Sequence, residues 1–425
     1  MNSKDFLNKA YEFGFDNFQI FSKTKFAKKI EMADGVILSD TIKNVNSYNY
    51  KGEILGKTVK GNSGYLSDDL LTELKEKAEL TDTNYDDVYL KGQKNILANF
   101  EVPSEDFVLI KNKILGLNKL REKYPLIKNV LVHYYYLNIY EEILDGDIIL
   151  QKGRCYHQVY LEVTSDDGEN QATESVSILM KELDFNNLEK KLLDLMEMAT
   201  LKLNVDGLDG GKYDVLFMNK ALSMMLDELL LAFSADEVHK DKSILKGKLN
   251  QKIFGENFTL IEEPLNKDYP GYTTFDNEGT PTTNKEIVSN GVLKTYLYDN
   301  KNALIDNKEN GGNYYGGIDV RNLYIKPGDT SYDEIIKGMK NGLIVTDFMA
   351  TGSAVNTLTG EISIQIFGFV VNDGKIARAF KPCVLTTSFF ELFNNIKVIG
   401  SDLMFDSESI GCPSALFEKL NISGS

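Results

Sequence analysis

Hydrophobic and polar residues alternate with two different periods along the chain, which predicts a mixed α+β fold. Residues 130–140 alternate with period two and lead through Ile143 and Leu144 to an Asp145–Gly146 turn. Residues 3–13, 67–78, 104–124 and 187–203 instead carry apolar side chains at helical spacing. Period two is typical of half-buried strands and a period near 3.6 of amphipathic helices. The order of helix, several strands and helix favours α+β over a doubly wound parallel sheet.

Turn signals between the apolar runs predict antiparallel hairpins. Pairs ending in glycine stand at residues 34–35, 51–52 and 290–291, and Asn372, Asp373 and Gly374 form a similar signal. Glycine accepts the positive φ that tight hairpins require. Ser331 and Glu334 have the spacing of a capping box and predict a helix start within the otherwise β-rich second half.

Three glycines near residue 207 interrupt the pattern and suggest a domain boundary. Gly207, Gly210 and Gly211 follow the helix predicted to end near residue 203. We therefore predict an N-terminal α+β domain over residues 1–205, of the α/β-sandwich type with antiparallel hairpins. A further division near residue 100 stays open. Residues 206–425 are predicted to form a mostly antiparallel β domain with few helices.

Charge and composition narrow the class of protein. The chain has 425 residues and a net charge of −16, which repels phosphate backbones and argues against direct nucleic-acid binding. No run approaches the roughly 20 apolar residues that span a bilayer. The N-terminus lacks the apolar core of a signal peptide, so we expect a cytoplasmic location and no membrane contact. The three cysteines are far apart in sequence and suggest no disulfide framework.

One basic group stands out against the acidic composition. Lys23, Lys25, Lys28 and Lys29 lie close together near the N-terminus, with acidic residues following closely. We interpret them as part of a solvated strand or loop.

Several stretches recur in a characteristic order and spacing across most of the chain. They are residues 243–249, 275–279, 291–297, 311–313, 356–363 and 413–414, with a looser match at residues 31–36 and 61–65. Together they resemble the TldD/PmbA family of metallopeptidases, also known as modulators of DNA gyrase, and most closely its PmbA (TldE) branch.

The resemblance implies a zinc peptidase assembled from two related chains that cleaves unfolded or leader peptides. Zinc-binding members carry His-Glu-x-x-x-His in the helix that corresponds to residues 226–232, and a distal cysteine as third ligand. Here Asp227 and Ala232 occupy the histidine places, and Ile399 stands near the cysteine place. Zinc requires imidazole, thiolate or carboxylate ligands, so only Asp227 retains a ligating side chain. We therefore expect no metal in this chain, with zinc held by a TldD-type partner.

The glutamate of the motif survives as Glu228, but its helix has lost the expected bend. Residues five apart are separated by roughly 140° on an ideal helix, so two metal ligands at this spacing need a distorted one. Leu231 stands where the family often has glycine, within a good helix-forming run. We predict a straight packing helix whose carboxylates, Asp227 and Glu228, lie away from the apolar stripe. A relic of the general base at Glu228 is the alternative.

The histidines offer no stronger site. His239 lies between charged residues and is interpreted as a surface residue rather than a replacement ligand. Cys155 and His157 are two apart in a predicted strand and share a face, but a metal would need further ligands from elsewhere. His133, beside three tyrosines, is interpreted as a sheet residue.

Three hypotheses follow for function. The first is a PmbA-like, non-catalytic subunit that pairs with a TldD-like zinc-bearing chain, or with itself as a homodimer, and helps to bind peptide substrates. The second is a metallopeptidase in its own right with an altered site at Asp227 and Glu228. The third is a protein-binding modulator of DNA gyrase. The sequence assigns no peptide-binding residues.

Overall fold

The structure is a computed structural model that describes residues 1–80, 90, 93–98, 100–349 and 355–424. Six long strands dominate the first 180 residues: β1 (Asn17–Ala33), β2 (Val36–Ile54), β3 (Lys57–Ser63), β4 (Ile127–Asp145), β5 (Ile148–Asp166) and β6 (Gln171–Met180). The strands that follow are β7 (Val205–Asp206), β8 (Gly211–Phe217), β9 (Leu260–Glu262), β10 (Lys285–Ser289), β11 (Val292–Leu293), β12 (Leu323–Ile325), β13 (Asn341–Met349), β14 (Glu361–Asn372), β15 (Lys375–Ser388), β16 (Ile396–Ile399), β17 (Met404–Phe405), β18 (Ile410–Cys412) and β19 (Ala415–Ile422).

Helices occupy the gaps between these strands. The described α-helices are α1 (Ser3–Glu12), α2 (Asp68–Leu80), α3 (Phe107–Leu117), α4 (Phe185–Leu201), α5 (Asn219–Leu230), α6 (Ala235–His239), α7 (Asn300–Asp306), α8 (Tyr332–Gly338) and α9 (Phe389–Asn394). Two 3₁₀ turns, η1 (Asn118–Lys123) and η2 (Leu231–Phe233), continue α3 and α5.

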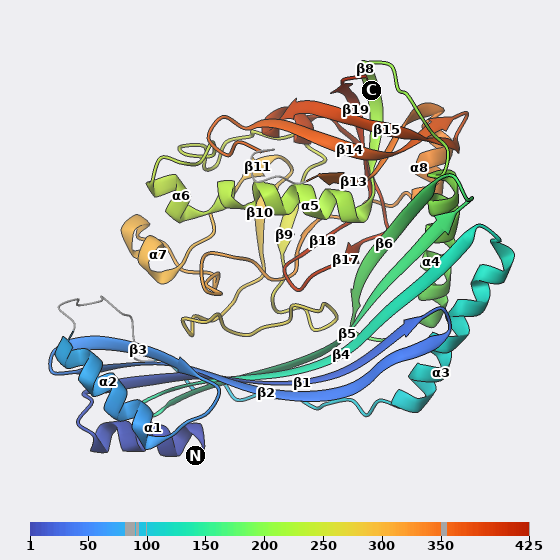
Figure 1. The fold of residues 1–425 in the computed structure, drawn as a ribbon. Helices are drawn as coiled ribbons and strands as arrows, with labels where there is room; N and C mark the ends of the chain where they lie inside the picture. Colours follow the sequence, from blue (N-terminus) through green and yellow to red (C-terminus); the bar gives the residue numbers. More distant parts are fainter. Residues whose placement is uncertain (81–89, 91–92, 99, 350–354, 425) are drawn as a thin grey trace.

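The strands form two mixed but mostly antiparallel sheets, as the hairpin signals predict. One has twelve strands in the order β11-β10-β9-β12-β18-β17-β6-β5-β4-β1-β2-β3, and the other has seven in the order β16-β19-β8-β13-β14-β15-β7. The larger sheet is strongly curved, and the second half of the chain lies on its concave side (Figure 1). The larger sheet therefore contains strands from both halves of the sequence.

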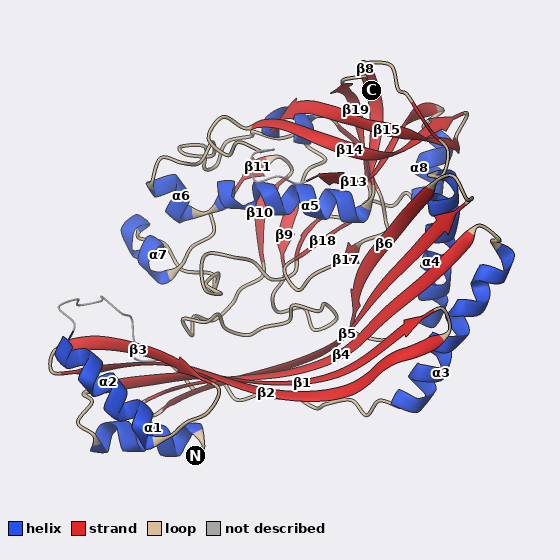
Figure 2. Ribbon diagram, viewed as in Figure 1, coloured by secondary structure: helices blue, strands red, loops and turns tan. Residues whose placement is uncertain are grey.

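Helices cover the outside of the curve, and one helix lies between the sheets. Figure 2 shows α1 and α2 below one end of the larger sheet, and α3 and α4 outside the other. Helix α5 contacts both β18 of the larger sheet and β13 of the smaller one. Its apolar face is fully buried in the largest hydrophobic core, through Leu222, Met225, Leu226 and Leu229. Because α5 packs between the two sheets, its buried face determines which of its other side chains can line a pocket.

Most turn predictions are confirmed, and one is wrong. Tight turns join β1 to β2, β4 to β5, β10 to β11 and β14 to β15 at the predicted places, and the predicted capping box begins α8. The turn predicted at Lys51–Gly52 is absent, because β2 runs on to Ile54 and turns at Leu55 and Gly56, which both have positive φ. A Cβ on Gly52 would lie 2.5 Å from the Phe18 ring, so this glycine makes room for aromatic packing.

Two helix predictions need correction at their ends. The segment predicted as one helix over residues 104–124 is divided into α3 and the 3₁₀ turn η1. The straight helix predicted through residue 232 ends at Leu230, and Ala232 lies in the 3₁₀ turn η2. The predicted apolar stripe is confirmed within α5 itself.

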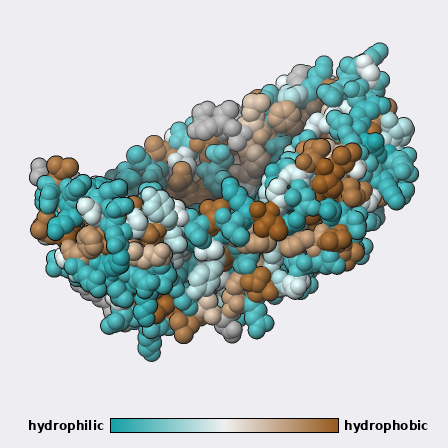
Figure 3. Space-filling model, turned by 60° about the horizontal axis from the view of Figure 1, so that its bottom comes forward, coloured by the Kyte–Doolittle hydropathy of each residue, from teal (hydrophilic) through white to brown (hydrophobic). Residues whose placement is uncertain are grey.

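The surface of the larger sheet is mainly polar. Figure 3 shows hydrophilic side chains over most of one face, with small hydrophobic patches between them. In the part of the chain that the structure describes, no helix is long and apolar enough to cross a membrane.

Candidate functional site

Helix α5 presents Asp227 on the side opposite its buried stripe. Polar contacts fix the start of the helix: the Asn219 side-chain amide donates to the backbone oxygens of Cys412, at 3.0 Å, and Asp402, at 2.6 Å. The Lys220 ammonium pairs with the Asp347 carboxylate at 2.5 Å. These contacts and the packed stripe orient Asp227 away from the core, as the sequence predicts.

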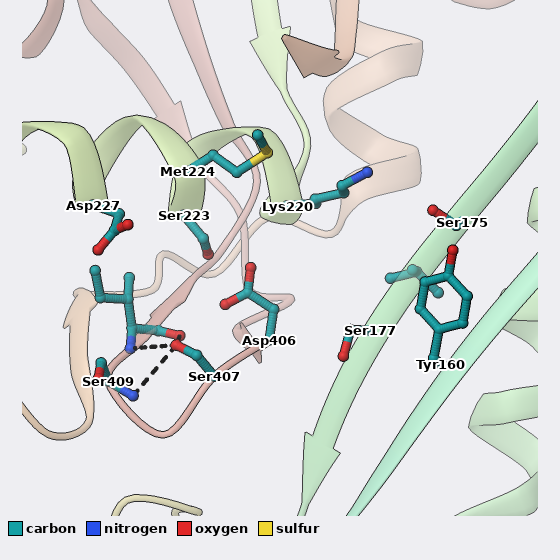
Figure 4. Close-up of a pocket in the computed structure, with 12 residues that line it drawn as sticks. Tyr160, Ser175, Ser177, Lys220, Ser223, Met224, Asp227, Asp406, Ser407 and Ser409 are labelled. Atoms are coloured by element: carbon teal, nitrogen blue, oxygen red, sulfur yellow. Dashed lines mark hydrogen bonds between the residues drawn. The ribbon is translucent and has the colours of Figure 1, made fainter. Parts of the chain in front are cut away.

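Asp227 lines a pocket of about 470 Å³, which we call the helix pocket. Its walls are α5, the loop around Asp406 and the strands β5 and β6 (Figure 4). Asp227 and Ser223 point from the helix toward the loop, and Asp406 points back toward the helix (Figure 4). The Ser407 hydroxyl accepts from the backbone amides of Ser409 and Ile410, at 3.3 and 3.0 Å, and so holds the loop in shape.

The carboxyl groups in and beside the helix pocket have raised pKa values. Burial raises the pKa of Asp406 to about 6, and the nearby Asp227 charge adds to the rise while Lys220 opposes it. The pKa of Asp227 is raised, first by loss of hydration and then by repulsion from Asp319. The pKa of Glu228 is raised for the same first reason and by Asp227. Poor hydration and like charge together favour the protonated forms.

The residues at the positions that correspond to the metal ligands of the resembled motif do not converge. Ala232 is buried in the core with 1% of its surface exposed, and Ile399 packs at the margin of that core from β16. Neither lines the helix pocket, nor does Glu228. Within the described ranges, no group of three or more His, Cys, Asp or Glu side chains is placed to hold a metal ion. The donor set present here does not fit the tetrahedral zinc site of the resembled motif.

The helix pocket also borders an open strand edge. Strand β6 pairs with β5 along its whole length but with β17 only through Leu179. Along residues 171–178, no described strand pairs with the other edge of β6. Ser175, Val176 and Ser177 of this stretch line the pocket. An unpaired edge offers backbone donors and acceptors to an added strand, so the pocket is suited to an extended peptide.

Sequence reasoning did not identify Asp406, Lys220 or the serines as pocket residues. Asp406 lies 179 positions beyond Asp227, since 406 − 227 = 179, and reaches it only through the pairing of β17 and β18. The run Asp406-Ser407-Glu408-Ser409 is polar and stands between apolar strands, which was the available signal. Cys412 is fully buried behind the pocket, and burial raises its pKa to about 12, so it remains a thiol.

The three histidines lie outside the helix pocket. His239 contacts Asn302 at 2.7 Å and Asp306 at 2.8 Å, so it is a partnered residue beside α7. His157 is buried in β5 with its Nδ1 3.0 Å from the Tyr134 hydroxyl. Burial lowers the pKa of His157 to about 4, with Lys181 adding repulsion. His133 lies in β4, as predicted for a sheet residue.

A family model described as the PmbA/TldA metallopeptidase C-terminal domain matches residues 210–424. The chain belongs to the PmbA/TldD family. The matched region includes α5, the Asp406 loop and the whole smaller sheet except β7.

Related proteins agree with this membership. A metalloprotease PmbA homologue of Buchnera aphidicola is 30% identical over 210 residues, which cover 49% of this chain and 46% of that protein. Metalloprotease PmbA of Escherichia coli O157:H7 is 27% identical over 231 residues, covering 54% and 50%. The chain thus spans about half the length of the relatives it matches.

Solved structures share the whole fold. A putative modulator of a DNA gyrase from Thermotoga maritima superposes with a TM-score of 0.84 at 25% identity, covering 99% of both chains. TldE from Thermococcus kodakarensis has a TM-score of 0.82 at 19% identity, also covering 99% of both chains, and this similarity concerns the fold alone.

Proposed function

We propose that this chain is the non-catalytic, PmbA/TldE-like subunit of a zinc metallopeptidase complex that cleaves unfolded or leader peptides. The observation that carries the proposal is that most residues at the metal positions of the resembled motif cannot bind a metal, although the helix pocket is formed. Of Asp227, Ala232 and Ile399, only Asp227 has a ligating side chain, whereas the pocket beside them and the open edge of β6 are intact.

In this proposal, the chain contributes part of the peptide groove and a zinc-bearing TldD-type chain contributes the chemistry. An extended peptide adds to the β6 edge through backbone hydrogen bonds, which accept many sequences. Its side chains on one face enter the helix pocket between Lys220, Asp227 and Asp406. In this proposal Glu228 does not activate a metal-bound water, and its position outside the helix pocket supports that assignment.

The test compares peptide cleavage by this chain alone, by a TldD-type chain with intact His-Glu-x-x-x-His, and by their mixture. We expect cleavage to require the mixture and to survive Glu228→Ala in this chain. Ser175→Trp fills the helix pocket and is expected to raise the KM of the mixture about tenfold, whereas Ser175→Ala leaves it within about twofold. Zinc-dependent cleavage by this chain alone, abolished by Glu228→Ala, refutes the proposal and supports independent metallopeptidase activity.

The similar protein from Thermotoga maritima is named a putative modulator of a DNA gyrase, so the experiment has a second arm. Supercoiling by gyrase is measured with this chain present and absent. A change caused by this chain alone, with no peptide cleavage by the mixture, supports the modulator function instead.

A further inference from the structure

A second cavity, of about 250 Å³, lies where the two halves of the chain meet. We call it the junction cavity. Strands β1, β2, β4 and β5 supply one wall, and the second half of the chain supplies the other. Its charged lining residues are Lys23, Glu141, Lys152, Arg154, Arg321 and Glu408. The lining thus contains four cationic and two anionic side chains, which is unusual for a chain with a net charge of −16.

Three of the cations share one carboxylate. Glu141 lies 2.9 Å from Arg154 Nη1, 3.1 Å from Lys23 Nζ and 3.5 Å from Lys152 Nζ. The side chains of Lys152 and Arg154 are 3% and 6% exposed, so water does little to separate these charges. A single carboxylate balances only one of the three positive charges.

The other carboxylate of the lining, Glu408, pairs with Arg154. The Nε and Nη2 atoms of Arg154 donate to the two Glu408 oxygens at 3.1 and 3.0 Å, which is a bidentate pair across the junction. Burial raises the pKa of Glu408, but Arg154 and then Arg321 reverse this and hold it at about 2. The side chains that line the cavity therefore carry more positive than negative charge.

On the opposite wall, the Arg321 side chain has N–H groups that make no hydrogen bond to a described residue. Its side-chain hydrogen bonds to described residues, including those to Asp319 at 3.1 Å and Ser409 at 3.1 Å, all leave from Nη1. The guanidinium carbon lies 3.8 Å from the centre of the Tyr315 ring, which fixes its plane. Asp319 compensates part of the Arg321 charge, and Asp276, which does not line the cavity, attracts Lys152. Burial has the largest effect on Lys152: together with repulsion by Arg154 and Arg321 it outweighs the attraction of Glu141 and Asp276 and lowers the pKa of Lys152 to about 8.

Domain-bridging ion pairs alone do not account for this arrangement. A bridge between the halves needs only Arg154 and Glu408, whereas Lys23 and Arg321 add positive charge around an open volume that Glu141 and Asp319 balance only in part. Uncompensated charge in a poorly hydrated site is costly unless a counter-charge fills it. Lys23 is also the one member of the N-terminal lysine group that lines the cavity. Lys28 and Lys29 pair instead with Asp40 and Glu31.

We propose that the junction cavity binds an oxyanion, a carboxylate or phosphate group held between Lys23 on one half of the chain and Arg321 on the other. Asn49 and Asn277, which also line the cavity, add neutral donors. The site is separate from the helix pocket and does not depend on the proposed peptidase role. Two sources share this chemistry: the C-terminal carboxylate of a peptide and a free small anion.

The test is isothermal titration calorimetry of the full chain in a chloride buffer. The probes are inorganic phosphate, succinate, and one short peptide with either a free or an amidated C-terminus. We expect Lys23→Gln and Arg321→Gln each to weaken binding of the preferred probe about tenfold, as loss of a charge-assisted hydrogen bond requires. Arg121→Gln is the matched control, since it removes an equal charge from the exposed pair with Asp34, away from the cavity, and should leave binding unchanged.

The probes identify the source of the anion. Binding of the free-acid peptide but not of its amide indicates a peptide terminus. Binding of phosphate or succinate, with neither peptide bound, indicates a free anion. The proposal is overturned if no probe binds, or if Arg121→Gln weakens binding as much as Lys23→Gln and Arg321→Gln do. Because the readout needs no partner chain, its failure is distinct from a failure of the proposed peptidase role.

Discussion

Asp406 in the helix pocket imposes a pH-dependent cost on folding that Asp406→Asn should remove. Burial and the Asp227 charge raise its folded pKa to about 6 from an unfolded value of 3.8. A shift of about two pKa units corresponds to about 3 kcal/mol. Because neighbouring groups relax, we expect Asp406→Asn to increase the free energy of unfolding by about 1–2 kcal/mol near neutral pH.

The size of the effect, but not its sign, changes with pH in a defined window. Below about pH 4, Asp406 is protonated in both folded and unfolded chains, so its ionisation costs nothing. Between about pH 4 and 6, the unfolded chain releases this proton and the folded chain keeps it, so stability falls as pH rises. The advantage of Asp406→Asn should therefore be near zero at about pH 4 and complete at about pH 7.

Urea unfolding followed by circular dichroism at about pH 4, 5.5 and 7 measures this advantage as a shift in midpoint at constant slope. Asp209→Asn is the matched control, because Asp209 is exposed and its substitution should change little at any of these pH values. An equal advantage at the lowest and highest pH, or a loss of stability near neutrality, would show that the Asp406 carboxylate is not held at a cost.

Three further substitutions test the structure around the pocket. Leu226→Ala, at a fully buried position of α5, should cost about 2–5 kcal/mol in urea unfolding, and a cost under 1 kcal/mol would contradict the sandwiched position of the helix. Ala232→His places an imidazole at a buried site; we expect about 1–3 kcal/mol of destabilisation and no zinc by elemental analysis, so near-stoichiometric zinc would contradict the fit argued above. Gly291→Ala puts a Cβ 2.1 Å from the Phe254 oxygen at φ +79°, and it should lower the thermal midpoint more than Gly168→Ala, where φ is also positive but the space is open.

The sequence predicts local structure well wherever one short signal decides it. Asn290–Gly291 and the Ser331–Glu334 box lie where the turn and the helix start are found. The turn predicted at Lys51–Gly52 is wrong because a glycine can either allow positive φ in a turn or leave room for a neighbouring side chain, and Gly52 leaves room for the Phe18 ring. Only the packing of another strand, here β1, distinguishes these two roles.

The candidate site could be predicted only in part. The apolar stripe of α5 placed Asp227 on the open side, because helical spacing fixes which residues share a face. Asp406 and the β6 edge could not be found in this way, since their approach to α5 depends on the order of strands in the twelve-stranded sheet. The junction cavity was even harder to predict from the sequence, because Lys23 and Arg321 lie almost 300 positions apart, since 321 − 23 = 298.

The contacts around α5 show how hydrogen bonds and packing hold this helix in place. A zinc site ties a helix to a distant strand through shared ligands, so losing the ligands would free the helix unless other bonds replace them. Here the Asn219 amide bonds to the backbone of Cys412 and Asp402, and so connects α5 to the same C-terminal region. The buried stripe of α5 adds contacts with both sheets. These hydrogen bonds and packing contacts come from the chain's own residues, and the peptide groove proposed above depends on them to keep its shape.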